Sequence, residues 1–127
     1  MAARSNNVVV WFEIPADNME RVVAFYETIM DVRLKREDMG GAELAVFPRS
    51  EECAASGCVM RAKPGQKRGL GTMIYLNCDG KLQSAVGRVE KAGGKLRTPV
   101  IQLPNNMGSF IHIEDTEGNL VGLHAID

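Results

Sequence analysis

Residues 108–124, Gly-Ser-Phe-Ile-His-Ile-Glu-Asp-Thr-Glu-Gly-Asn-Leu-Val-Gly-Leu-His, have the pattern of two strands joined by a tight turn. The predicted turn is Asp-Thr-Glu-Gly-Asn at 115–119, where Gly and Asn tolerate positive φ and Asp and Thr bond the local backbone. Side chains alternate along both arms, so that Ile111 lies on an apolar face and His112 on the opposite one. Such alternation is typical of a strand with one face on a core. Both histidines of the protein, His112 and His124, lie on the other face, where any chemistry is expected.

Length and composition predict one globular domain spanning 1–127. The chain is 45% hydrophobic and 24% charged, which is ordinary for such a domain. Its net charge of -1 gives no attraction to nucleic acid or to an anionic membrane surface. No apolar run approaches the roughly 18 residues of a membrane span. We therefore expect neither a nucleic-acid partner nor a membrane.

The cysteines and the N-terminus favour a cytoplasmic location. Cys53, Cys58 and Cys78 form an odd set without C-x-x-C spacing, which indicates reduced thiols and no disulfide frame or zinc site. The first residues lack the apolar core of a signal peptide.

The first half of the chain predicts a strand, a helix and three further strands. The first strand is expected to stop at Pro15, and Asp17 with Glu20 three residues later forms a capping-box pattern for the helix. The predicted segments are a strand at 8–14, a helix ending near residue 30, and strands at about 32–37, 42–47 and 57–62.

The second half repeats this order. Asp79 is predicted to cap a second helix, and Gly93 with Gly94 to end it. The predicted segments are a strand at 72–78, the helix, a short strand at 95–98, a loop at 99–107 and the hairpin.

The duplication predicts an α+β fold of two βαβββ repeats, because one such unit is too short to bury both its sheet face and its helix. Repeat one spans about 7–63, a polar linker about 63–70, and repeat two about 71–127. We expect the two mixed sheets to pair around a common cavity, with the helices outside.

Three stretches resemble the vicinal oxygen chelate superfamily, which includes glyoxalase I, bleomycin-resistance proteins and extradiol dioxygenases. They are Trp11-Phe-Glu-Ile-Pro-Ala-Asp-Asn-Met-Glu-Arg with Phe25-Tyr26, then Val89-Glu-Lys-Ala-Gly-Gly94, and Glu114-Asp-Thr-Glu-Gly-Asn119. The resemblance covers nearly the whole chain and is closest to short bacterial glyoxalase-related proteins. These motifs are turns and caps, so they concern the fold rather than the reaction.

The resemblance also implies four metal-ligand positions on cavity-facing strands, usually His and Glu. Carried over, they fall at Val9 or Trp11, within 58–61 (Cys-Val-Met-Arg), at about Met73 and at Gly122. None is a ligand for a hard metal. The usual metal site is therefore expected to be lost, and no cofactor is predicted.

Two polar alternatives remain on the cavity side. Glu13 with His124 is a candidate acid–base pair, because a His can act as a base near neutral pH. If a metal is bound at all, the candidate ligands of a displaced site are Glu13, His112 and His124. Otherwise each of these residues is a satisfied polar group at the cavity rim. Cys58 is interpreted as a packed core residue.

An apolar, aromatic wall predicts a pocket for a small organic molecule. The candidate ligand-binding residues are Trp11, Met60, Met73, Tyr75, Asn77, Phe110 and His112. The alternative is that these side chains only fill the space between the sheets.

Three interpretations follow. The first is a metal-free member of the superfamily that binds a small organic molecule, for example to sequester it. The second is a glyoxalase-like lyase or isomerase, or a dioxygenase, with a displaced metal site. The third is an interaction module whose sheets make a homodimer. The resemblance implies that dimers are common.

Overall fold

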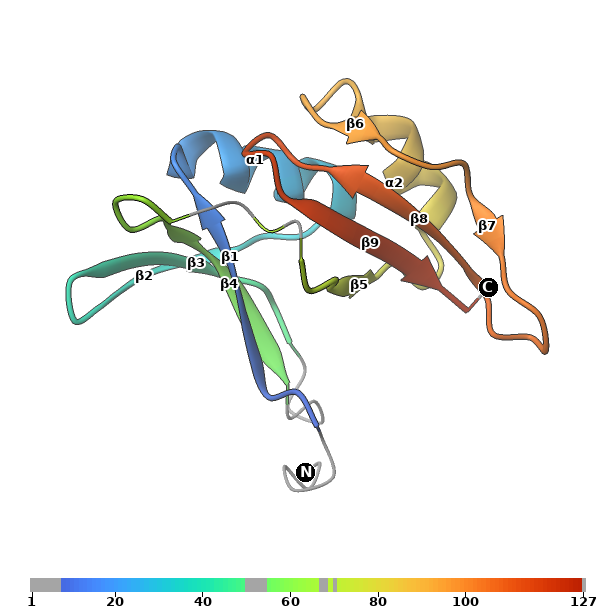
Figure 1. The fold of residues 1–127 in the computed structure, drawn as a ribbon, viewed down its shortest axis with the longest axis horizontal. Helices are drawn as coiled ribbons and strands as arrows, with labels where there is room; N and C mark the ends of the chain where they lie inside the picture. The colour runs from blue at the N-terminus through green and yellow to red at the C-terminus, as the bar shows by residue number, and fades with distance from the viewer. Residues whose placement is uncertain (1–7, 50–54, 67–68, 70, 127) are drawn as a thin grey trace.

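The computed structural model describes residues 8–49, 55–66, 69 and 71–126. It has the predicted α+β fold, with two mixed sheets that each belong to one βαβββ unit (Figure 1). In the described part of the chain, no helix is long and apolar enough to cross a membrane. The predicted linker at 63–70 lies partly outside the described residues.

The first repeat forms a four-stranded sheet in the order β1-β4-β3-β2. Strand β1 runs parallel to β4, and the β2–β3 hairpin is antiparallel. The elements are β1 (Trp11–Ala16), α1 (Met19–Met30), β2 (Lys35–Met39), β3 (Ala42–Val46) and β4 (Ser56–Arg61).

The second repeat has the same plan. Its sheet has the order β5-β9-β8-β6, and β5 is parallel to β9 as β1 is to β4. The elements are β5 (Tyr75–Asn77), α2 (Leu82–Val89), β6 (Lys95–Leu96), β7 (Ile101–Gln102), β8 (Ser109–Glu114) and β9 (Leu120–Ala125). Strand β7 lies in the segment predicted to be a loop and pairs with β8.

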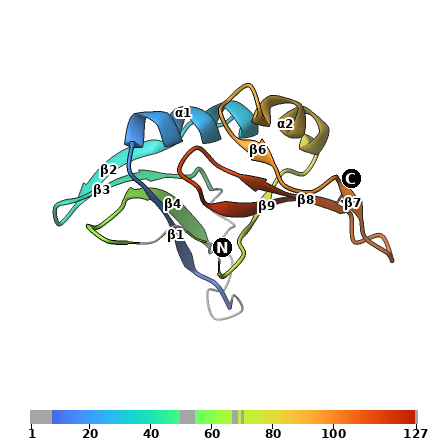
Figure 2. The same ribbon diagram turned by 45° about the horizontal axis from the view of Figure 1, so that its top comes forward.

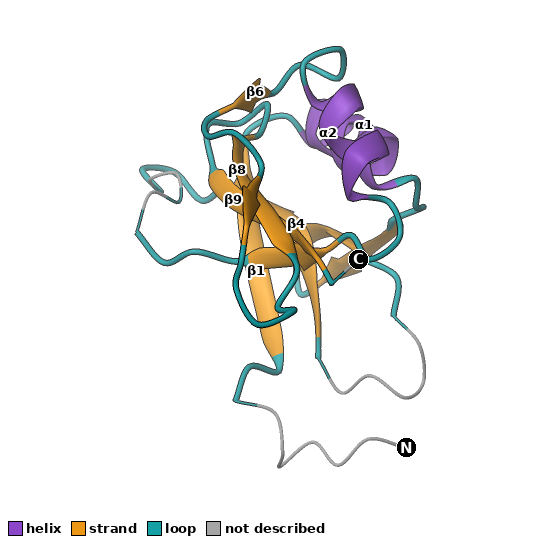
Figure 3. Cartoon of the chain, turned by 90° about the vertical axis from the view of Figure 1, so that its right-hand side faces the viewer, coloured by secondary structure: helices purple, strands orange, loops and turns teal. Residues whose placement is uncertain are grey.

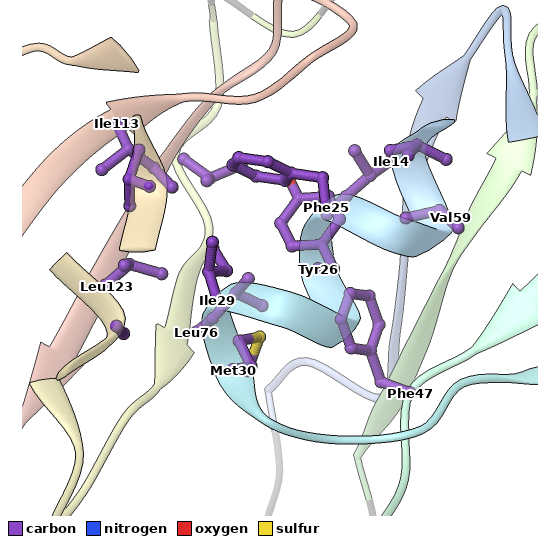
Figure 4. Close-up of a cluster of buried hydrophobic side chains, with 14 of the residues drawn as sticks. Ile14, Phe25, Tyr26, Ile29, Met30, Phe47, Val59, Leu76, Ile113 and Leu123 are labelled. Carbon is purple, nitrogen blue, oxygen red and sulfur yellow. The ribbon is translucent and has the colours of Figure 1, made fainter. Parts of the chain in front are cut away.

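Both helices cover the same side of the two sheets (Figures 2 and 3). Helix α1 buries its apolar face between the sheets (Figure 4). Ile14 and Val59 of the first sheet lie on one side of its aromatic residues, and Ile113 and Leu123 of the second sheet lie on the other. The apolar face predicted for Ile111 therefore packs against α1, and one core joins the two repeats.

The β8–β9 turn of the second repeat forms hydrogen bonds with the first repeat. Asp115 accepts the Tyr26 hydroxyl at 2.7 Å. Glu117 accepts the backbone N–H of Asp17 at 2.9 Å, and the Asn119 side-chain amide donates to the Pro15 carbonyl at 2.8 Å. The three acidic and amide side chains are at most 7% exposed. They tolerate burial because hydrogen bonds satisfy them.

The predicted helix ends and the end of β1 differ from the structure. Helix α2 ends at Val89 with Glu90 as its C-cap, before Gly93 and Gly94. Helix α1 is capped by Asn18, whose side chain accepts the Arg21 N–H, rather than by Asp17. Helix α2 has Lys81 at its N-cap and no side-chain cap, because the Asp79 carboxylate accepts the Ile126 N–H instead. Strand β1 continues through Pro15 to Ala16. A proline is tolerated there because β1 is an edge strand.

Candidate functional site

The face of the second sheet opposite the helices carries five of the predicted residues, Tyr75, Asn77, Phe110, His112 and His124, in two rows. Strand β9 lies between β5 and β8, and its register pairs Gly122 with both Tyr75 and His112. The next row pairs His124 with Asn77 on one side and Phe110 on the other. Because side chains alternate along each strand, both rows point away from the helices.

Tyr75 reaches His112 by lying across Gly122. The Tyr75 hydroxyl is 2.8 Å from His112 Nε2. A Cβ on Gly122 would lie 2.3 Å from Tyr75 Cδ2, so only glycine leaves room for the ring in this position. The His112 backbone N–H donates to the Thr98 hydroxyl at 3.0 Å, which ties β8 to the segment after β6.

Phe110 completes an aromatic cluster with these two rings. Its centroid is 5.8 Å from that of Tyr75, edge to face, and 5.3 Å from that of His112. The Tyr75 and His112 centroids are 5.6 Å apart. Tyr75 is 49% exposed, so the cluster presents aromatic surface to solvent beside a hydroxyl and an imidazole. We call Tyr75, Phe110 and His112 the aromatic cluster.

His124 and Asn77 bond locally at the edge of this cluster. His124 Nε2 is 2.8 Å from the Met107 carbonyl oxygen. A carbonyl only accepts, so this nitrogen carries the proton and donates. Asn77 accepts the Asp79 N–H through its side-chain oxygen at 2.8 Å.

The first sheet holds the other candidates on its own strands. The Trp11 indole N–H donates to Glu13 at 3.1 Å, and Glu13 lies opposite Cys58 in the β1–β4 register. Burial, followed by the charge of Glu13, raises the pKa of the Cys58 thiol to about 12. Met60 is buried in a small cluster with Leu44 and Cys58. Met73 is half-buried just before β5.

The structure thus brings Tyr75, Phe110 and His112 together, with Asn77 and His124 in the adjacent row. Glu13 bonds with Trp11 and not with either imidazole. Across 8–49, 55–66, 69 and 71–126, no three His, Cys, Asp or Glu side chains gather in a way that could hold a metal ion, and this covers Glu13, His112 and His124.

The side chains at the four implied ligand positions do not fit a divalent metal. Gly122 has no side chain, and the Tyr75 ring fills the space where one would begin. Cys58 is buried beside Leu44 and Met60, and among the described residues it belongs to no group of three His, Cys, Asp or Glu side chains that could hold a metal ion. Trp11 and Met73 carry no donor that a hard cation prefers.

Sequence reasoning missed two features. It treated Gly122 as a lost ligand position and did not recognise that the Tyr75 ring packs against this glycine. It also missed an open cleft of about 500 Å³ on the helix side of the sheets, to which only Asn77 of the predicted residues contributes. The cleft depends on how the repeats pack, and no local motif signals that.

The family model of the Glyoxalase/Bleomycin resistance protein/Dioxygenase superfamily matches residues 8–123. No protein with curated annotation matches the sequence.

Several solved structures share the fold. A glyoxalase-related enzyme from Fulvimarina pelagi has a TM-score of 0.69 and 14% identity, covering 92% of this chain and 86% of that one. A glyoxalase I mutant from Zea mays has a TM-score of 0.69 and 16% identity, covering 91% of this chain and 45% of that one. The fosfomycin resistance protein FosX from Listeria monocytogenes has a TM-score of 0.64 and 14% identity, covering 94% of this chain and 93% of that one. At these identities the likeness is one of fold.

Proposed function

The chain belongs to the Glyoxalase/Bleomycin resistance protein/Dioxygenase superfamily, and we propose that it binds a small organic molecule without a metal ion. The proposed site is the face of the second sheet opposite the helices. The observation that carries the proposal is the aromatic cluster of Tyr75, Phe110 and His112.

The cluster has the composition of a small-molecule site. Such sites combine apolar and aromatic surface with a few polar groups that orient the ligand. Here the phenol and the imidazole are held 2.8 Å apart, so their orientation is set before a ligand arrives. The half-exposed Tyr75 ring offers a stacking surface for a flat molecule. An aromatic ligand of low polarity is the class that fits best.

The metal-dependent mechanisms of the superfamily need donors that the corresponding positions here do not supply. Gly122 and Trp11 offer none, and Cys58 is a buried thiol. The proposed ligand is therefore recognised by ring contacts and hydrogen bonds rather than by chelation.

The test is a binding screen in the presence of EDTA. Phenol, benzamide, indole and quinoline serve as probes, with thermal stabilisation as the first readout and calorimetry for those that shift the melting temperature. We expect at least one probe to bind, with at least tenfold weaker binding to Tyr75→Ala and Phe110→Ala. Met39→Ala is the matched control, because Met39 is an exposed apolar residue of β2 outside the cluster. Binding that requires added metal, or that both cluster variants retain in full, would refute the proposal.

A second use of the same site is acid–base catalysis. The Tyr75–His112 hydrogen bond has a length suited to proton transfer, and a His can take up a proton near neutral pH. If the site catalyses proton transfer, a bound probe that carries an acidic C–H should exchange that hydrogen for deuterium from the solvent. His112→Gln would abolish the exchange and leave probe binding within about threefold.

The homodimer and the cytoplasmic location predicted from the sequence remain proposals. Cys58 and Cys78 are free and buried, which suits a reducing compartment. Exposed apolar residues outside the cluster, such as Val9 and Ile126, are available to a second copy. Light scattering at micromolar concentration would give twice the 13.9 kDa chain mass for a dimer.

A further inference from the structure

A second candidate site lies apart from the residues of the aromatic cluster. It is the cleft of about 500 Å³, within the range of ordinary small-molecule sites. Both repeats contribute to it, and we call it the inter-repeat cleft. Its lining includes Phe12, Met30, Val32, Phe47, Leu76 and Lys81.

Apolar side chains form one wall of the inter-repeat cleft. The Phe12 and Phe47 rings pack with centroids 5.7 Å apart, and Phe12 also lies over Gly57. Phe12 and Val32 are only half-buried, so part of this wall faces the opening. A ring or short alkyl chain in the cleft would remove that surface from water.

Polar groups gather on the other wall. Asn77, Asp79 and Lys81 follow one another where β5 leads into α2. The Asp79 carboxylate already accepts a hydrogen bond from the Ile126 N–H at 2.8 Å. The Lys81 ammonium donates to the Met30 carbonyl at the end of α1, at 2.6 Å.

The Lys81 ammonium at the polar wall of the cleft retains donors and charge that can serve a ligand. An ammonium has three donors, and the Met30 carbonyl uses one. Among the described residues, no carboxylate forms an ion pair with Lys81. The Ser56 hydroxyl also lines the cleft, is buried, and has no hydrogen-bond partner in the described structure. Both groups can donate to an anion.

We propose that the inter-repeat cleft binds a small amphipathic carboxylate, with its apolar body against Phe12 and Phe47 and its carboxylate on Lys81. The carboxylate supplies the missing counter-charge, and its charge-assisted hydrogen bond is stronger than a neutral one. The site is distinct from the aromatic cluster, because none of Tyr75, Phe110 and His112 lines the cleft.

Paired probes test the charge. Phenylacetate, indole-3-acetate and octanoate are compared by calorimetry with their uncharged amides. We expect at least one acid to bind at least tenfold more tightly than its amide, and added salt to weaken the acid more than the amide. Equal affinity of every acid and its amide, or no binding by any acid, would overturn the proposal. This comparison needs only the wild-type protein, so it holds even if a variant fails to fold.

Variants then locate the site. Lys81→Met should remove the preference for the acid and leave amide binding within about threefold. The control Lys91→Met removes the same charge at an exposed position and should leave the preference intact. Val32→Trp should weaken acid and amide alike by filling the cleft. Tyr75→Ala should affect neither, which separates this site from the aromatic cluster. An acid preference that persists in Lys81→Met would refute the assignment.

Discussion

Gly122 is the residue on which the geometry of the aromatic cluster depends. The Tyr75 ring occupies the space of its missing side chain and so comes within 2.8 Å of His112. The sequence placed all three residues on one face, because alternation in strands is regular. It could not place Tyr75 beside His112, since that contact depends on the register of three strands.

We predict that Gly122→Ala displaces the Tyr75 ring and breaks its contact with His112. The expected loss in free energy of unfolding is about 1 kcal/mol, because overpacking costs energy but Tyr75 is half exposed and can turn outward. In a Tyr75→Ala background the same change should cost nearly nothing. A double-mutant cycle by urea unfolding measures the difference. Equal costs in both backgrounds would show that the ring does not lie over Gly122.

We predict that Cys58 and Cys78 resist alkylation in the folded protein. Burial is the main cause that raises the pKa of Cys58 to about 12 and that of Cys78 to about 11, so little thiolate exists at pH 8. In a Cys53→Ser background, iodoacetamide should react with these thiols at least 100-fold more slowly than after unfolding in urea. Native alkylation of Cys58 at the unfolded rate would contradict its interpretation as a packed core residue.

At the scale of elements, the β8–β9 hairpin is the part that sequence reasoning predicted best. Its turn residues have strong local preferences, and the strands and turn lie where the pattern placed them. The helix caps were predicted less well. Asp17 and Asn18 are both good capping residues, so the local pattern does not choose between them. The N–H groups of both donate to Glu117, which lies 99 residues beyond Asn18.

The buried Glu117 carboxylate should make folding sensitive to acid. Burial alone would raise its pKa, but hydrogen bonds from Arg21, the N–H groups of Asn18 and Asp17, and Thr116 outweigh this and lower the pKa to about 2. The unfolded value is 4.5, so this stabilisation is complete above about pH 5 and is lost as the pH falls towards 2.

Glu117→Gln should therefore make the free energy of unfolding depend less on pH in the acid range. Between pH 6 and pH 2, wild type should lose on the order of 3 kcal/mol more than the variant in free energy of unfolding. Urea unfolding at a series of pH values measures this, with the exposed Glu90→Gln as control. Parallel pH curves for wild type and Glu117→Gln would contradict the assignment.

At the scale of the whole molecule, helix α1 is shared by both sheets, and the β8–β9 turn bonds to its first turn. The duplicated order of elements predicted the fold class, because two matching units without separate cores must bury their faces together. How the units pack, and hence the inter-repeat cleft, follows from contacts between distant segments such as Met30 and Lys81. No local pattern encodes these contacts.

We predict that the two repeats unfold in a single transition. Calorimetric and van't Hoff enthalpies should agree, and far-UV circular dichroism should coincide with tryptophan fluorescence from Trp11 in the first sheet. Tyr26→Phe, which removes the hydroxyl that Asp115 accepts, should lower the free energy of unfolding by about 1–3 kcal/mol and keep one transition. Two separate transitions in wild type would show that the shared core does not couple the repeats.

We propose that the chain binds a small organic molecule on the aromatic cluster without a metal. The most direct test is a nuclear magnetic resonance titration of isotope-labelled protein, in EDTA, with the tightest aromatic probe. We expect saturable shifts at Tyr75, Phe110, His112 and their strand neighbours, and loss of these shifts in Phe110→Ala. Shifts that begin only when a divalent metal is added, or that avoid β5, β8 and β9 altogether, would contradict it.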